Sequence, residues 1–113
     1  MTLEAYFSTG PAHERPIFEA VMDSLGTIGP VHVEPVSVGI FLKRARSFAQ
    51  LRPRDKWVNL SFGLRRRLDS PRIRTRQDAG GGRTHHVIRL VGPDDVDEEV
   101  RDWLAEAYAL VPD

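Results

Sequence analysis

Two segments of the chain repeat their hydrophobic residues at the spacing of an α-helix, one near each end. The first stripe predicts a helix over about residues 13–27 and consists of Ile17, Phe18, Val21, Met22, Leu25 and Ile28. The second predicts a helix over about residues 93–111 and consists of Val96, Val100, Trp103, Leu104, Ala107, Tyr108 and Val111. Because an isolated helix of this length is marginal in water, each stripe must be buried against another layer. The acids of the first helix, Glu14 among them, are expected on its polar side, where Glu14 favours the positive end of the helix dipole.

Between these helices the pattern alternates with the two-residue period of β-strands. Strands are expected at 31–36, 38–44, 47–53, 56–64, 72–77 and 84–91. Pro35 favours an edge position for the first strand, because proline cannot donate a hydrogen bond to a neighbour. The glycines of segment 78–82 suit the turn between the last two strands. Successive hairpins of this kind predict an antiparallel meander of five or six strands.

These elements predict an α+β fold, a two-layer sandwich with the N- and C-terminal helices on one face of the sheet. The chain of 113 residues is expected to be one domain, with a core over about residues 6–111. In strand 56–64, Val58, Leu60, Phe62 and Leu64 are expected to face the helices. Trp57, Asn59, Ser61 and Arg65 are expected on the opposite, uncovered face.

The composition is that of a soluble globular protein, with 41% hydrophobic residues and no cysteine. The absence of cysteine excludes disulfides and thiolate metal sites, and it agrees with a reducing cytoplasm. The sequence has no apolar run long enough for a membrane span, and its first residues do not resemble a secretory signal. We therefore expect a cytoplasmic protein that does not bind membranes.

The formal net charge is zero, but the charges are unevenly distributed along the chain. The segment from Lys43 to Arg89 carries 14 basic residues against three acids, a net charge of +11. The two ends together carry two basic residues and 13 acids, a net charge of −11. Such asymmetry indicates a partner that is nucleic acid or another polyanion. A bias of base composition toward arginine codons, or acidic helices that face water, would give the same pattern.

The uncovered sheet face is the candidate binding surface. Arginines beside a tryptophan can pair with phosphates while the indole stacks on a base. In the alternative interpretation, the arginines keep this face soluble and the tryptophan is a packing residue. The residues expected on the binding face are Trp57, Asn59, Arg65, Arg72, Arg74, Arg76, His85 and Arg89. Gln50 and Arg52 join them if strand 47–53 has the matching phase.

The adjacent histidines of the segment RTHHVIRL are not expected to form a metal site. Neighbouring side chains of a strand point to opposite faces, so the two rings cannot share one ion. His86 is expected on the core side as a hydrogen-bonded residue, and His85 on the open side with Arg89. No cofactor motif is present in the sequence, and none is expected to bind.

Several segments carry a resemblance to a known family. They are YFSTGP, RPIFEAVMDSLGTIGPV, RARSFAQLRP, WVNLSFGL and, most specifically, RTHHVIRLVGPDDVDEEVRDWLAEAY. From about residue 6 to residue 110, the chain resembles a bacterial family of small domains known as domain of unknown function 5655. Its architecture is also distantly similar to YdhG and YjbR/MmcQ-like domains. The resemblance implies a two-layer α/β domain, but no activity and no catalytic residues.

Three hypotheses for the function follow. The favoured one is a non-catalytic binding module whose basic open face engages nucleic acid or another polyanion. The second is an interaction domain in which a homodimer covers that face. The third is an enzyme or small-molecule-binding domain with His85, Arg89 and Trp57 around a pocket, where a histidine and an arginine would act on an anionic substrate.

Overall fold

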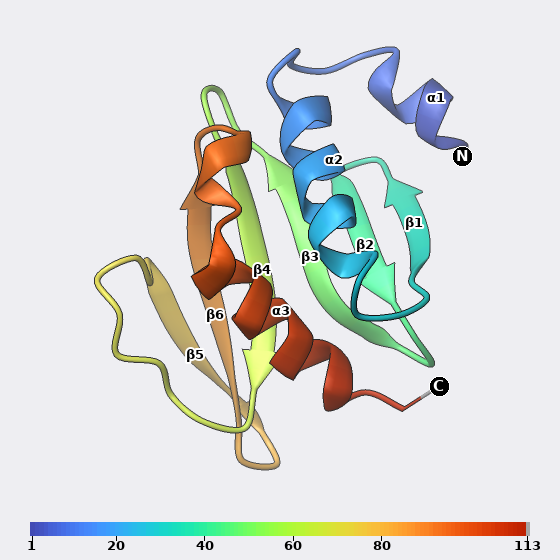
Figure 1. Ribbon diagram of the computed structural model, residues 1–113. Helices are drawn as coiled ribbons and strands as arrows, with labels where there is room; N and C mark the ends of the chain where they lie inside the picture. Colours follow the sequence, from blue (N-terminus) through green and yellow to red (C-terminus); the bar gives the residue numbers. More distant parts are fainter. Residues whose placement is uncertain (113) are drawn as a thin grey trace.

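Six antiparallel strands form one open sheet, and two helices lie across one of its faces (Figure 1). The computed structural model describes residues 1–112. The helices are α1 (Leu3–Phe7), α2 (Glu14–Leu25) and α3 (Glu98–Ala109), and a short 3₁₀ turn, η1 (Pro93–Asp95), precedes α3. The strands are β1 (His32–Val36), β2 (Gly39–Lys43), β3 (Ser47–Pro53), β4 (Val58–Leu64), β5 (Thr75–Gly80) and β6 (Arg83–Leu90). The predicted α+β sandwich is confirmed.

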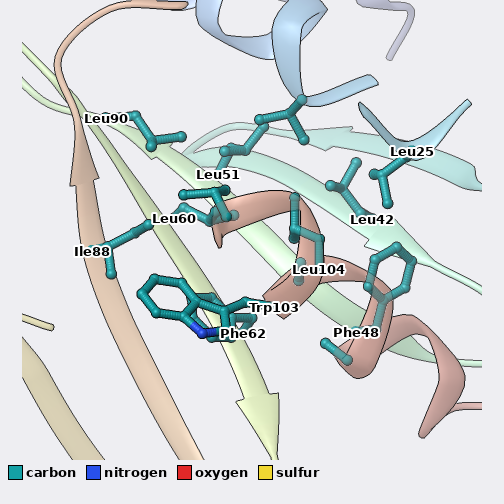
Figure 2. Packing of buried hydrophobic residues seen from close by; sticks show 14 of the residues in the cluster. Leu25, Leu42, Phe48, Leu51, Leu60, Phe62, Ile88, Leu90, Trp103 and Leu104 are labelled. Carbon is teal, nitrogen blue, oxygen red and sulfur yellow. The ribbon is translucent and has the colours of Figure 1, made fainter. Parts of the chain in front are cut away.

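The core lies between the sheet and helices α2 and α3, where their apolar stripes meet the alternating residues of the strands. Strand β4 shows the alternation most clearly, because every second residue from Val58 to Leu64 is buried and those between are half-exposed. The rings of Phe62 and Trp103 stack with centroids 5.7 Å apart at the centre of this layer (Figure 2). Burial of these side chains is the main stabilising contribution to the fold.

Helix α3 begins later than the sequence pattern predicts. Pro93 opens the 3₁₀ turn, and Asp97 is the residue that caps the α-helix. The Asp97 side chain accepts a hydrogen bond from the backbone N–H of Val100, which satisfies a donor that the first turn leaves free. The backbone of Asp97 is extended, so the helix cannot continue through it from residue 93.

The strand order is β1-β2-β3-β4-β6-β5, which departs from a simple meander at one point. Strand β6 pairs with β4, and β5 lies outside it at the edge. The edge position of β1, which contains Pro35, agrees with the sequence pattern. The β5–β6 hairpin turns through three glycines with positive φ, Gly80, Gly81 and Gly82.

The connection between β4 and β5, residues 65–74, crosses the helix side of the sheet instead of making a tight turn. Its apolar residues Leu68 and Ile73 are buried. The backbone N–H of Leu68 donates a 3.0 Å hydrogen bond to Nε2 of His86 on β6, and Arg76 Nε donates to the Leu68 carbonyl. This segment therefore covers the part of the sheet beyond α3. It also explains why β5 starts at Thr75 and not at the predicted residue 72.

Helix α1, which the sequence pattern does not predict, brings Tyr6 against the start of α2. The hydroxyl of Tyr6 donates a short hydrogen bond to Glu14 Oε2. Glu14 is 2% exposed, so its predicted place on the polar side of the helix is wrong. Burial raises the pKa of Glu14, while the Tyr6 hydroxyl and then His13 act in the opposite direction. Burial, together with the Glu14 carboxylate, raises the pKa of Tyr6, so its hydroxyl keeps the donated proton.

The different roles of the two sheet faces can be tested on neighbouring residues of β4. Replacing Leu60 by Ala is expected to lower the free energy of unfolding by about 2–5 kcal/mol, because it leaves a cavity in the core. Replacing Ser61, which points the other way, by Ala is expected to change it by less than about 0.5 kcal/mol. Urea unfolding followed by circular dichroism measures both values. Losses of similar size would contradict the assignment of a buried and an open face.

The buried carboxyl of Glu14 gives a second prediction. Because its pKa is raised in the folded state, the favourable contribution of the protonated form is lost as the pH rises through that pKa. The stability of Glu14→Gln relative to the unaltered chain is therefore expected to increase between about pH 4 and pH 7. Urea unfolding at several pH values measures this difference. A difference that stays constant with pH would show that Glu14 titrates alike in both states.

Candidate functional site

Three residues on adjacent strands form a polar row across the open face of the sheet. Arg52 on β3 lies opposite Asn59 on β4, and Asn59 lies opposite Arg89 on β6. Residues that face each other across an antiparallel pair share a sheet face, and Asn59 alternates with the buried Val58 and Leu60. The row therefore lies on the side away from α2 and α3. Both arginines are exposed, and neither forms an ion pair with an acid within residues 1–112.

Trp57, just before β4, is attached to this row by two contacts. Its indole Nε1 donates a 2.8 Å hydrogen bond to Asn59 Oδ1. The guanidinium carbon of Arg89 lies 4.2 Å from the centroid of the indole ring, which is a cation–π contact. The predicted association of Trp57, Asn59 and Arg89 is thus present in the structure, and strand 47–53 has the phase that adds Arg52. We call these four residues the Arg52–Arg89 row.

A surface hollow of about 490 Å³ lies beside Trp57, at the end of the sheet where β3 turns into β4. Its lining residues are Pro11, Pro53, Arg54, Asp55 and Trp57. The turn is closed by a 2.8 Å hydrogen bond from the Arg54 N–H to the Trp57 carbonyl, which also lies 3.2 Å from Nε2 of His13. These contacts fix the turn against the start of α2. The sequence pattern does not predict this hollow, because Pro11 is 42 residues or more from the other lining residues.

At the β1–β2 edge of the open face, the charge of a lysine is already neutralised by a glutamate. Lys43 Nζ on β2 lies 3.5 Å from a carboxylate oxygen of Glu34 on β1. The free positive charge of the face is therefore concentrated near β3, β4 and β6. Arg54 and Lys56, both exposed in the β3–β4 turn, extend this basic region past the end of the strands.

Two arginines expected on the binding face lie on the helix side. Arg72 contacts Asp97 at 2.9 Å and Glu99 at 3.3 Å, and it donates to the Asp95 carbonyl. Arg76 lies opposite the buried His86 and donates to the Leu68 carbonyl. The expectation that Arg72 and Arg76 lie on the open face is therefore wrong, because the pairing of β5 with β6 directs Arg76 toward the core side. Residue 72 lies outside the strand altogether.

The remaining predicted residues lie away from the row. Arg65 and Arg74 are exposed in the connection between β4 and β5, just outside the strands. His85 is exposed on the open side of β6, but it is four residues from Arg89, or about 13 Å along an extended strand. It lines a separate hollow of about 40 Å³ with Ser47, Gly63 and Arg83 among its other residues. The structure therefore does not bring His85, Arg89 and Trp57 around one pocket.

His86 lies on the core side, as the alternation predicts, and is fully buried. Its ring stacks on Phe62 with centroids 5.5 Å apart, and Nε2 accepts the hydrogen bond from Leu68. Burial lowers the pKa of His86, the Phe62 backbone opposes this, and the charges of Arg76 and Arg66 add to the decrease. The neutral ring is the form that can accept from Leu68, so His86 serves the fold.

All the helices and strands, and with them the Arg52–Arg89 row, fall within the match to one family model. The family is described as Domain of unknown function (DUF5655), and its model matches residues 3–111. The chain belongs to this family. Its membership in DUF5655 confirms the resemblance seen in the sequence, whereas the similarity to YdhG and YjbR/MmcQ-like domains stays a prediction. No curated protein and no solved structure matches the chain.

Membership in DUF5655 assigns no ligand to the row, so its chemistry has to be argued from its residues. Among residues 1–112, no cluster of three or more histidine, aspartate or glutamate side chains is arranged to hold a metal ion. None of the helices in that part of the chain is long and apolar enough to cross a membrane. What the row offers is two guanidinium groups, an amide and an indole, which are suited to anions and flat rings.

The structural role of His86 can be tested through the pH dependence of stability. Because the pKa of His86 is lowered in the folded state, the contribution of its neutral ring to stability is fully present above the ordinary pKa of 6.5. This contribution is lost as the pH falls below that value. Replacing His86 by Leu is expected to cost about 1–3 kcal/mol at pH 8, since the buried Leu68 N–H loses its acceptor. The difference between the two proteins should be smaller at about pH 5. Urea unfolding at both pH values measures it, and a difference that grows on acidification would contradict this role.

Proposed function

We propose that this DUF5655 domain is a non-catalytic binding module whose open sheet face engages a polyanion, with nucleic acid as the favoured class. The observation that supports it is the Arg52–Arg89 row, in which two exposed guanidinium groups flank an amide without an acidic partner within residues 1–112. Guanidinium groups bind phosphate oxygens through paired, charge-assisted hydrogen bonds.

The contrast with the helix side strengthens this proposal. Arg66 contacts Glu106 at 2.8 Å, and Arg72 contacts two acids near the start of α3. These arginines are already neutralised by the chain itself, so a polyanion would have to displace a carboxylate to reach them. On the open face, a phosphate would meet cations without that cost. Arg54 and Lys56 of the neighbouring turn would add to the attraction.

Binding of this kind depends strongly on salt, because each phosphate that is neutralised releases counterions. We expect the chain to bind a short oligonucleotide at low salt, with an affinity that falls linearly on a logarithmic plot against salt concentration. Replacing both Arg52 and Arg89 by Gln is expected to weaken binding and to reduce the slope by about 1 or more. Fluorescence anisotropy with a labelled oligonucleotide, titrated at several salt concentrations, measures both.

A matched control removes the same charge elsewhere. Arg67 and Arg74 are exposed in the connection between β4 and β5, and the Arg67→Gln, Arg74→Gln double variant should bind almost as well as the unaltered chain. Equal losses in the two double variants would mean that diffuse charge, and not the row, attracts the ligand. If no oligonucleotide binds at low salt, the proposal fails. A dimer seen by light scattering would then favour the alternative in which a second copy covers the face.

A further inference from the structure

The hollow beside Trp57 indicates which form of nucleic acid the face would take. This inference rests on the proposed function and concerns the same site. From the geometry of the row and the hollow, we infer that the ligand is single-stranded and that it places one unpaired base in the hollow while its phosphates lie on the Arg52–Arg89 row. The two surfaces meet at Trp57, which belongs to the row and lines the hollow.

The lining of the hollow offers surface for a flat ring and carries no net charge. Pro11, Pro53 and Trp57 present apolar or aromatic surface, while Arg54 contributes a guanidinium and Asp55 a carboxylate. The indole offers the stacking surface on which proteins commonly hold unpaired bases. With about 490 Å³, the hollow is within the size range of small-ligand sites. The base would therefore lie in the hollow, and the phosphates would lie on the row.

A double helix cannot use both surfaces. Its bases are stacked on one another, so only the sugar–phosphate backbone and the base edges are offered to a protein. A duplex could reach the arginines, but it would leave the hollow beside Trp57 empty. A single strand can turn a base out of its stack and fill the hollow. The structure thus favours a single strand over a duplex of the same length, even though the duplex carries about twice as many phosphates.

A ligand without bases shows how much a base in the hollow contributes to binding. Three labelled probes are compared at one low salt concentration: a thymidine 12-mer, an abasic 12-mer with the same phosphate backbone, and a 12-base-pair duplex. We expect the thymidine strand to bind roughly tenfold tighter than the abasic strand, as one stacked base allows. We also expect the thymidine strand, but not the abasic strand, to quench the fluorescence of Trp57. A change can be assigned to Trp57 because the other tryptophan, Trp103, is only 6% exposed and contributes a constant background.

The variant Trp57→Leu, whose fold is checked by circular dichroism, is expected to bind the thymidine strand no tighter than the abasic strand. Equal binding of these two strands to the unaltered chain would overturn the inference and leave the proposed function standing. Binding of the duplex as tight as that of the thymidine strand would do the same. If none of the three probes binds, the proposed function fails, and the inference fails with it. The comparison between probes needs no variant, so it remains decisive even if Trp57→Leu does not fold.

Discussion

The hydrogen bond from the Leu68 N–H to Nε2 of His86 anchors the connection that distributes the basic middle of the chain between the two faces of the sheet. It holds the connection between β4 and β5 against the helix side of the sheet, where Leu68 and Ile73 are buried. Once the connection lies there, Arg66 and Arg72 are within reach of the acids of α3. The arginines of β3 and β6 remain on the opposite side. A buried histidine with no direct part in binding thus helps to place Arg66 and Arg72 where the acids of α3 neutralise them.

The structure divides the basic residues of the middle segment into two groups, those that acids of the same chain neutralise and those that stay available. Part of the positive middle and part of the negative C-terminal end neutralise each other across the helix side, so that part needs no external partner. Ion pairs at such exposed positions contribute little to stability, and their main effect is to remove charge from one side of the molecule. The remaining basic residues include Arg65, Arg67 and Arg74 in the β4–β5 connection and a smaller basic region on the open face near Trp57. The region near Trp57 carries the proposal, and it is more localised than the net charge of +11 suggests.

The features that depend on local periodicity and on hairpins could be predicted from the sequence, and those that depend on long-range pairing could not. The alternation in β4 and the stripes of α2 and α3 identified the layers and the open face. The alternation of Arg72, Arg74 and Arg76 showed a two-residue period, but the face is set by the register of Arg76 opposite His86. The sheet face of Arg52 was ambiguous because two neighbouring residues, Phe48 and Ala49, are both buried. They lie beside an irregular pairing of β2 and β3. Glu14 was misplaced because its partner Tyr6 lies in a helix of five residues, too short to produce a periodic signal.

The pairing of β4 with β6, across the long connection, has a consequence for the order of folding events. The β2–β3 and β5–β6 hairpins join residues that are close in sequence and can form early at small entropic cost. The central pair joins Leu64 to Thr84 and Val58 to Leu90, so a long loop must close before any of its contacts form. Until it closes, the apolar side of β4 lacks one of its neighbours. The pairing of β4 with β6 is therefore expected to form after the two hairpins, because its loop-closure cost is larger.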